Sequence, residues 1–166
     1  LSDGAVHLPI GHIRAAEEQP RTHFDEARIS ALAESIKTDG ILQPIVVRRV
    51  GQATFIIIAG ERRYRASLRA GLTEVPVIIK DVSETEAYEL ALIENVQRED
   101  LNPIEEAEAY EYLSKNSGLS HEAIAQRVGR DRVTVTNTLR LLKLTPHVRE
   151  LIVANQLTAG HARAVL

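Results

Sequence analysis

Hydrophobic and polar positions follow two different patterns along this chain of 166 residues. Up to about residue 80, short apolar runs rich in β-branched residues alternate with amphipathic stretches, a pattern that predicts strands mixed with helices. From Ser83 onward the apolar positions recur at helical spacing, which predicts an all-helical region. The chain is therefore expected to be an α+β protein with two domains, residues 1–93 and residues 94–166.

Turn residues separate the predicted elements of the first region. Gly51 and Gln52 lie between two apolar runs, which predicts a β-hairpin. Gly40 follows an amphipathic stretch at the position where a helix commonly ends. The predicted elements are, in chain order, an extended segment over 5–13, a helix over 26–39, strands over 45–50 and 54–59, a helix over 61–70 and a strand over 75–80.

Capping residues mark the predicted helices of the second region. Ser83 and Glu86 have the spacing of a capping box, and Pro103 suits the first turn of a helix. The predicted helices are one that begins at Ser83, one over 103–116, one over 120–128, one over 131–143, one opened by Pro146, and one that is capped by Thr158 and runs to the end of the chain.

A short helix, a turn at Gly129 and a second helix have the pattern of a helix-turn-helix over about residues 120–143. In DNA-binding proteins with this motif, the N-terminal turn of the second helix meets bases and phosphates. An αα-hairpin that serves only packing is the alternative, but the basic outer face favours contact with DNA. The residues expected to pack between the two helices are Ile124, Ala125, Val128, Val135, Leu139 and Leu142. The residues expected to contact DNA are Arg130, Arg132, Thr134, Asn137, Arg140 and Lys143.

The distribution of charge indicates a polyanion site in the second region. The whole chain has 20 basic and 23 acidic residues and a net charge of −3, which excludes a uniformly basic nucleic-acid coat. Residues 120–166 nevertheless carry seven basic and three acidic side chains, a net charge of +4, whereas the remainder has a net charge of −7. A basic segment on an acidic body is typical of a local site for DNA, although a solvated charged face would have the same composition.

Composition removes several other classes of function. The chain has no cysteine, which excludes disulfides, thiolate metal sites and cysteine nucleophiles and is typical of a reducing compartment. Its six histidines show neither H-x-x-x-H nor H-E-x-x-H spacing, so zinc ligation is not indicated. No apolar run approaches the ~18 residues of a membrane span. Four acidic residues of the predicted helix over 103–116 are interpreted as a solvated face, namely Glu105, Glu106, Glu108 and Glu111.

The turn after the second hairpin strand predicts a phosphate site. The strand ends at Gly60, and a helix begins at once with Glu61, Arg62 and Arg63. N–H groups at a helix start bind anions, glycine lets a phosphate approach the backbone, and arginine holds phosphate oxygens bidentately. The chain contains neither a P-loop nor a G-x-G-x-x-G fingerprint. An arginine-rich helix start paired with nearby acids is the alternative interpretation.

Two further motifs carry less chemical information by themselves. Glu94 and Asn95 place hard oxygen donors near a helix end, where they suit Mg²⁺, although a polar helix exit would look the same. Gln19 and Arg21 flank a proline in the loop before the first long helix, from which they could reach a ligand.

In their order along the chain, these motifs resemble those of the ParB family of chromosome and plasmid partition proteins. The resemblance is carried by ILQPIVVR at 41–48, GERRYRA at 60–66, ENVQREDLNP at 94–103, the helix-turn-helix, and AGHAR at 159–163. It implies an N-terminal ParB/sulfiredoxin-like domain that binds CTP, followed by a helical domain that binds parS, the centromere-like DNA site. It also implies a bacterial, cytoplasmic, nucleoid-associated protein that loads at parS, closes into a sliding DNA clamp with CTP bound, and hydrolyses CTP slowly.

The resemblance also implies roles for individual residues. By this resemblance Gly60, Arg62 and Arg63 would hold the triphosphate, Glu94 and Asn95 would bind Mg²⁺ and phosphate, Glu61 and Gln19 would act in hydrolysis, Arg21 would line the pocket, Gln43 would lie on the base side, and Arg132 would read DNA. Glu61 and Gln19 could only orient a water, and no strong general base is evident. Slow, DNA-stimulated hydrolysis is therefore expected, with CTP acting mainly as a switch.

The family's partners lead to the remaining expectations. Self-association through the N-terminal domain is expected when CTP is bound, and no membrane partner is expected. The family's C-terminal dimerisation domain, and the N-terminal tail that engages a ParA-type partition ATPase, have no counterpart here, so a truncated fragment is expected. The alternatives are a nucleoid-occlusion protein of the same superfamily and a transcription-regulating helix-turn-helix protein with a vestigial nucleotide pocket. A sulfiredoxin-like redox enzyme is excluded because its chemistry needs a cysteine.

Overall fold

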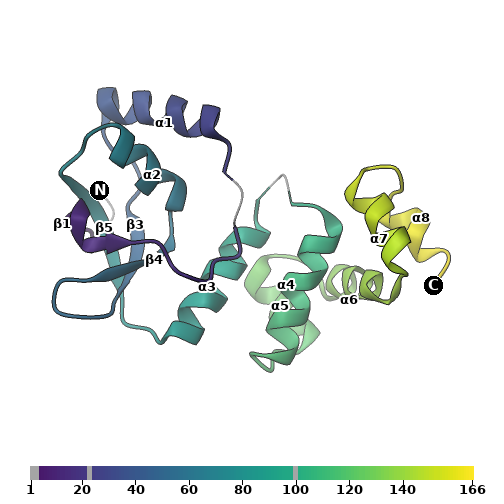
Figure 1. The fold of residues 1–166 in the computed structure, drawn as a ribbon. Coiled ribbons are helices and arrows are strands. Elements are labelled where there is room, and N and C mark those ends of the chain that lie inside the picture. Colours follow the sequence, from purple (N-terminus) through teal and green to yellow (C-terminus); the bar gives the residue numbers. More distant parts are fainter. Residues whose placement is uncertain (1–3, 22–23, 99–100) are drawn as a thin grey trace. The chain divides into compact units, whose positions relative to one another are not determined.

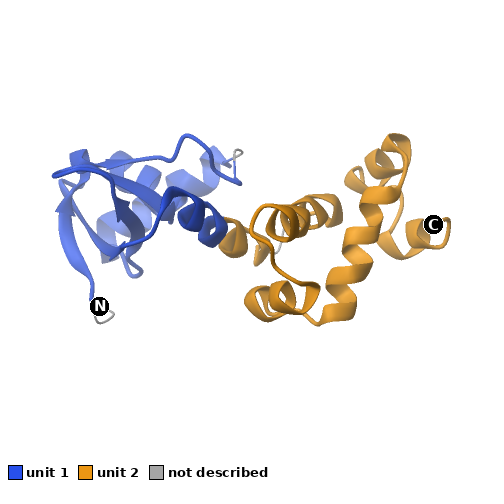
Figure 2. Ribbon diagram, turned by 90° about the horizontal axis from the view of Figure 1, so that it is seen from below, with its two compact units in different colours: residues 1–91 blue, residues 92–166 orange. Residues whose placement is uncertain are grey.

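A computed structural model describes residues 4–21, 24–98 and 101–166, and the chain divides into two compact units. The first unit comprises residues 1–91 and the second residues 92–166, coloured blue and orange in Figure 2. Helix α3 (Glu84–Val96) contains the division. The first unit holds a mixed sheet with helices and the second is helical, so the expected α+β fold class is confirmed.

The first unit is built on a five-stranded mixed sheet with the strand order β1-β5-β3-β4-β2. The central strand β3 forms the predicted antiparallel hairpin with β4 and pairs with β5 in parallel. The strands and the short 3₁₀ turn η1 are β1 (Val6–Pro9), η1 (Ile10–His12), β2 (Ile13–Arg14), β3 (Ile45–Arg49), β4 (Phe55–Ala59) and β5 (Glu74–Lys80).

The single extended segment predicted over 5–13 is wrong, because η1 breaks it into two strands. Strand β1 pairs with β5 at one edge of the sheet, and β2 pairs with β4 at the other. In a flat sheet four strand spacings would separate these edges by about 19 Å, whereas a 3₁₀ turn advances only about 2 Å per residue. The sheet must therefore curl strongly so that its edges approach each other. The backbone N–H of Ile10 donates to the carbonyl of Thr73 over 2.9 Å and holds this turn in place.

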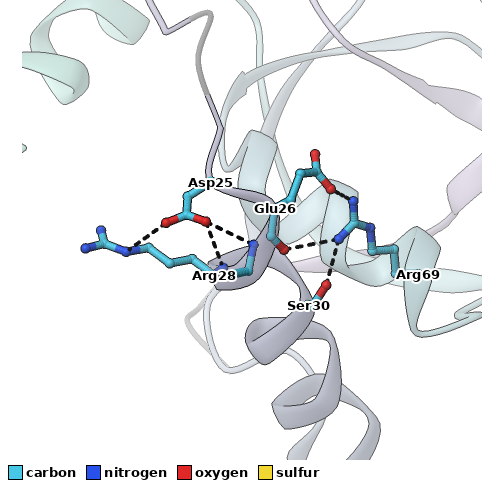
Figure 3. Close-up of polar contacts among 6 residues, drawn as sticks. Asp25, Glu26, Arg28, Ser30 and Arg69 are labelled. Carbon is cyan, nitrogen blue, oxygen red and sulfur yellow. Dashed lines mark hydrogen bonds and ion pairs between the residues drawn. The ribbon is translucent and has the colours of Figure 1, made fainter.

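Helices α1 (Glu26–Asp39) and α2 (Glu61–Arg69) lie side by side in the first unit (Figure 1). Figure 3 shows the polar contacts between them, in which Arg69 donates to the carbonyl of Glu26 and to the hydroxyl of Ser30 and pairs with the Glu26 carboxylate. The Asp25 carboxylate caps α1 by accepting from the N–H of Ala27 over 2.9 Å. These contacts fix α1 against α2, the helix that carries the predicted phosphate residues.

Among the described residues of the first unit, apolar side chains form a cluster on the sheet and another between the helices. One cluster lies on the sheet, and the phenol of Tyr64 on α2 donates across to the carbonyl of Ile13 on β2. The other lies between α1 and α2. The sheet cluster contains Ile13, Ile45, Val47, Phe55, Ile57, Val75 and Val77, and the helix cluster contains Phe24, Ile29, Ala33, Ile36 and Ala66.

In the second unit each helix after α3 begins at a polar side chain that caps its free N–H groups. The capping residues are Asn102, Ser120, Asp131, Thr145 and Thr158. The elements are α4 (Pro103–Lys115), α5 (His121–Val128), α6 (Arg132–Arg140), the 3₁₀ turn η2 (Leu141–Lys143), α7 (Pro146–Val153) and α8 (Ala159–Arg163).

The predicted helix over 131–143 is too long, because α6 ends at Arg140 and η2 follows. The residues that pack inward are Val135, Thr138 and Leu141, whereas Leu139 and Leu142 of the prediction are only partly buried. The tighter 3₁₀ turn explains the partial burial of Leu142. Each residue of a 3₁₀ turn rotates further around the axis than a residue of an α-helix, so the buried face shifts from Leu142 to Leu141. The last helix also ends earlier than predicted, at Arg163.

Within the described ranges, no helix is both long and apolar enough to cross a bilayer.

Candidate nucleotide and nucleic-acid sites

The strand-to-helix turn predicted at Gly60 is confirmed by the structure. Strand β4 ends at Ala59, Gly60 adopts a left-handed conformation (φ 103°, ψ 27°), and α2 begins at Glu61. L-residues with a side chain disfavour this backbone, whereas glycine adopts it without strain. Gly60, the N-cap, offers no side-chain hydrogen bond to this helix start within the described part of the chain, and the first N–H groups of a helix without such a cap can bind an anion. Phosphate binding at this turn remains a prediction.

Arg63 folds back over Gly60 and binds the loop that leads into β3. Its Nη1 donates to the carbonyl of Gln43 over 3.0 Å and to that of Pro44 over 2.6 Å. A Cβ atom at Gly60 would lie 3.2 Å from Nη2 of Arg63, so the missing side chain gives the guanidinium room. The structure therefore brings three predicted nucleotide residues together, Gln43, Gly60 and Arg63.

Glu61 and Arg62 each bury a polar atom that has no hydrogen-bond partner among the described residues. These atoms are Oε2 of Glu61 and Nε of Arg62. A buried polar atom without a partner is costly, and in native proteins it commonly indicates a bound group. The nitrogen needs an acceptor such as a phosphate oxygen, and the carboxylate oxygen needs a donor such as water. The residues present thus fit a hydrated phosphate.

A stack of aromatic and charged side chains supports Glu61 from the side. Its Oε1 pairs with Nε of Arg65 over 3.1 Å, and the Arg65 guanidinium lies 3.9 Å from the centre of the Phe24 ring. Arg21 approaches the same ring at 5.0 Å. The Phe24 ring and Arg65 thereby link Arg21 with Glu61, and the roles of these two residues in a nucleotide site remain predictions. Arg65 was not predicted as a site residue, although its i,i+4 spacing from Glu61 is a recognisable signal.

Gln19 lies half-buried in the loop before α1. Among the described residues no hydrogen bond connects its side chain with Glu61, so its role in hydrolysis remains a prediction.

The predicted magnesium residues Glu94 and Asn95 belong to the second unit, whereas Gly60–Arg63 belong to the first. Glu94 is exposed. Asn95 is buried, and its Oδ1 accepts a hydrogen bond of 3.0 Å from Nη1 of Arg98. This contact closes the end of α3, as the alternative interpretation of a polar helix exit expects. Metal binding by the pair remains a prediction, and the neighbouring Glu99 and Asp100 of the same motif lie outside the described residues.

No cluster of three or more acidic or histidine side chains that could hold a metal ion occurs among residues 4–21, 24–98 and 101–166. A divalent ion at Glu94 and Asn95 would therefore need further oxygen ligands from phosphates or water, which is the usual arrangement for Mg²⁺.

The predicted helix-turn-helix is present as α5 and α6. His121 Nδ1 and Thr136 Oγ1 are 2.9 Å apart and connect the two helices. At the start of α6, the Asp131 carboxylate accepts from the N–H of Thr134 over 2.7 Å. This hydrogen bond from the backbone lowers the pKa of Asp131, so the cap is charged at neutral pH.

Most of the predicted DNA residues lie on the exposed face of this motif. Arg132, Thr134, Arg140 and Lys143 are exposed, whereas Asn137 is only partly exposed. Between the first two lies Val133, whose 68 % exposure is high for an apolar side chain. Sequence reasoning overlooked this residue because a valine in a helix is first taken as a core position. Methyl groups on such a face can contact the methyl group of thymine. Contact of this face with DNA remains a prediction.

Two basic residues of the second unit serve the fold. Arg149 on α7 donates through Nε to the carbonyl of Leu144 over 3.1 Å and through Nη2 to that of Leu142. It thereby satisfies carbonyls at the end of η2.

Arg130 pairs with Glu106 of α4, whose side chain is only 20 % exposed. The interpretation of Glu106 as part of a solvated face is therefore wrong, because tertiary packing between α4 and the turn before α6 covers it.

The chain is a two-unit protein in which a mixed α/β unit with an arginine-rich helix start precedes a helix-turn-helix unit. Residues 2–96 match the family model described as the ParB N-terminal domain, and residues 99–166 match that of the ParB HTH domain. The chain belongs to the ParB family.

Three curated relatives are similar over nearly the whole chain. The chromosome-partitioning protein ParB of Myxococcus xanthus is 53 % identical over 163 residues, which is 98 % of this chain and 55 % of the relative. Spo0J of Thermus thermophilus is 52 % identical over 98 % of this chain and 60 % of the relative. The nucleoid occlusion protein of Geobacillus kaustophilus is 51 % identical over 96 % and 57 %. The chain thus spans 55–60 % of the length of these relatives.

Two solved structures of C-terminally truncated ParB from Caulobacter crescentus are similar to this chain. The complex with the centromeric parS site has a TM-score of 0.86 and 41 % identity, and covers 96 % of this chain and 83 % of that one. The complex with CTP-γ-S has a TM-score of 0.54 and 43 % identity, with coverages of 98 % and 91 %.

The geometry at Gly60 leads to a prediction about stability. We expect Gly60→Ala to lower the free energy of unfolding by more than Gly71→Ala. Both glycines have positive φ, of 103° and 76°, and the backbone strain of each variant is about 1–2 kcal/mol. Only at Gly60 would the added Cβ displace Arg63 and weaken its bonds to the 43–44 carbonyls, because nothing lies within 4 Å of a Cβ at Gly71. Urea denaturation followed by circular dichroism measures the difference, and equal losses would contradict the proposed packing of Arg63.

Proposed function

We propose that this chain is the nucleotide- and DNA-binding part of a chromosome-partitioning protein, which binds parS through α5 and α6 and CTP through the start of α2. The carrying observation is the uncapped helix start at Gly60 with the buried, unpartnered Nε of Arg62. Support for CTP comes from the Caulobacter crescentus complex with CTP-γ-S, and support for parS from its complex with the centromeric site.

The triphosphate is the part of CTP that these residues suit best. Backbone N–H groups at the start of α2, which has no side-chain cap among the described residues, and the guanidinium of Arg62 would offer hydrogen bonds and positive charge to phosphate oxygens. Arg63 binds the carbonyl of Gln43, so in our proposal one side chain shapes both the phosphate end and the base end of the site. Arg21, which lies 5.0 Å from the centre of the Phe24 ring, would line the pocket.

For Mg²⁺ we retain Glu94 and Asn95 as the proposed ligands. The ion would neutralise phosphate charge when bound. Asn95 Oδ1 accepts from Arg98 in the structure, so metal ligation by Asn95 requires that it exchange this partner for the ion.

We expect hydrolysis to be slow, because the site would orient a water molecule but has no strong general base to take its proton. Oε2 of Glu61 is buried and has no partner, while Oε1 is held by Arg65. Glu61, together with Gln19, would orient the attacking water. Phosphoryl transfer depends on positioning and charge stabilisation more than on covalent chemistry, so such a site can turn over slowly.

CTP would then act as a switch between two states of the protein. A ligand shifts an equilibrium only when it binds the two states with different affinity. We propose that CTP favours a state in which two N-terminal domains associate and close around DNA, and that hydrolysis reverses it. In this proposal the protein loads at parS and acts on the bacterial nucleoid in the cytoplasm. The whole protein would also engage a ParA-type ATPase.

A second candidate function is nucleoid occlusion, which the 51 % identity to the Geobacillus kaustophilus nucleoid occlusion protein supports. The two functions differ in the DNA site that is bound. Binding-site selection from a random duplex pool by this chain distinguishes them, because each function requires its own operator.

The nucleotide proposal predicts a selective loss on removing the Arg62 guanidinium. We expect the chain to bind CTP with Mg²⁺ more tightly than ATP, GTP or UTP, and Arg62→Gln to weaken CTP binding by about tenfold or more, since charge-assisted hydrogen bonds to phosphate are lost. Calorimetric titration with and without parS duplex measures the affinity of the chain and of each variant for the four nucleotides. Arg28→Gln is the matched control, because the Arg28 side chain is 67 % exposed in the same unit. Equal affinity for all four nucleotides would contradict the proposal.

The hydrolysis proposal predicts that binding and turnover separate at Glu61. We expect Glu61→Gln to keep CTP affinity within about threefold and to lower the rate of phosphate release by at least roughly tenfold, because the buried Oε2 that orients water is replaced. A phosphate-release assay with and without parS measures the rate. Rapid hydrolysis by the unaltered chain without DNA would argue against a switch.

The DNA proposal predicts a sequence-dependent effect at Arg132. Arginine at the start of a recognition helix reads guanine through two hydrogen bonds, worth about 1–3 kcal/mol of discrimination. We expect Arg132→Ala to lose roughly tenfold in affinity for parS and much less for a scrambled duplex. Lys115→Ala is the control, since the Lys115 side chain is 73 % exposed on α4. Fluorescence anisotropy measures both affinities, and equal losses on both duplexes would assign Arg132 to phosphate.

A further inference from the structure

Helix α4 contacts the turn of the helix-turn-helix through three side chains. The Glu106 carboxylate on α4 lies 3.8 Å from Nε of Arg130, which follows the turn glycine. The phenol of Tyr110, one helical turn further along α4, donates to the same Glu106 oxygen. The backbone N–H of Arg130 donates to the carbonyl of Ala125 over 3.0 Å. Both the backbone and the side chain of Arg130 are therefore held.

Tyr110 is the buried anchor of this network. Its side chain is fully buried, and burial raises the pKa of Tyr110, an effect to which Glu106 adds and which Arg130 opposes. The phenol therefore keeps its proton at neutral pH and donates it to Glu106. The carboxylate is in turn fixed in the orientation that faces the guanidinium of Arg130.

The exposure of the pair indicates a role beyond stability. The Arg130 side chain is 45 % exposed, whereas that of Glu106 is 20 % exposed. The guanidinium of Arg130 thus lies beside a partly buried carboxylate, while part of the Arg130 side chain remains accessible. Arg130 lies directly before Asp131, the cap of α6, where backbone phosphates pass a recognition helix.

We propose that Glu106 is a positioning residue for DNA binding: it holds the guanidinium of Arg130 in the orientation that contacts a DNA phosphate beside the start of α6. This inference rests on the proposed binding of parS. A long, flexible side chain loses conformational entropy when it is fixed at an interface, so fixing it before binding increases affinity. The charge of Glu106 opposes this gain by repelling DNA, and the two effects predict opposite results for its removal.

The test compares two acidic residues of the same helix. Glu106→Gln and Glu108→Gln each remove one negative charge from α4, but Glu108 is exposed and serves as the matched control. We measure affinity for a parS duplex and a scrambled duplex by anisotropy at several salt concentrations. Positioning predicts that Glu106→Gln weakens parS binding about three- to tenfold, whereas Glu108→Gln leaves it unchanged or slightly tighter.

A second comparison shows whether Glu106 acts through Arg130. The slope of log affinity against log salt is negative, and Arg130→Ala is expected to reduce its magnitude by about one, the change for one lost phosphate contact. In the Arg130→Ala background, Glu106→Gln is expected to have no further weakening effect, since its target is gone. Tyr110→Phe, which keeps the ring and removes the hydrogen bond, is expected to change affinity in the same direction as Glu106→Gln, and thermal unfolding of every variant reports its stability.

Several results would overturn the inference. Glu106→Gln could bind parS as tightly as Glu108→Gln or more tightly, which would mean that Glu106 only repels DNA or withholds Arg130 from it. Glu106→Gln could also weaken parS binding in the Arg130→Ala background, which would mean that Glu106 acts through the fold and not through Arg130. If the unaltered chain bound parS no better than the scrambled duplex, the proposed function would fail first, and the inference with it.

Discussion

The left-handed backbone of Gly60 is the constraint on which the first unit depends. It lets the chain pass from strand β4 into α2 within one residue, so that Glu61, Arg62 and Arg63 follow directly after the end of an interior strand. Arg63 can then return over the glycine to the carbonyls of Gln43 and Pro44. The same turn leaves the first N–H groups of α2 uncapped. A single backbone conformation thus determines the positions of donors from both side chains and main chain.

Charge in the second unit is divided between the fold and the outer face. The net charge of +4 over residues 120–166 indicates a polyanion site, but the contribution of each base differs. Arg149 binds carbonyls of Leu142 and Leu144 and so completes the end of the recognition element. Arg132 and Arg140 are exposed on the outer face. Net charge therefore locates a region, whereas burial and hydrogen bonding decide which cations within it can meet a ligand.

Local signals were sufficient to predict much of the fold. The hairpin of β3 and β4, the start of α2 after Gly60 and the caps of the later helices follow from residue types at fixed spacing, because their physics involves neighbours in sequence. The break of the N-terminal segment at η1 was not predictable in this way. It depends on Thr73 and on strand partners 40 or more positions away, as in the pairing of Ile13 with Phe55.

The candidate sites show the same limit. Residue types indicated that Arg62 and Arg63 were suited to phosphate, but only the fold shows that Arg63 also binds Gln43 and that Arg65 holds Glu61. Glu106 was assigned to a solvated face because its helix neighbours are acidic, and packing against Arg130 reverses that interpretation. Where a side chain contacts a partner that is distant in sequence, the spacing of residues along the chain does not predict that contact.

The two unpartnered atoms at the start of α2 constrain what can bind there. Oε2 of Glu61 accepts hydrogen bonds and Nε of Arg62 donates one, yet these adjacent groups do not satisfy each other. An anion alone would satisfy the arginine and repel the carboxylate, and a cation alone would do the reverse. A phosphate accompanied by water offers an acceptor to Arg62 and a donor to Glu61. The pair therefore favours a ligand that supplies both an acceptor and a donor over one that binds by charge alone.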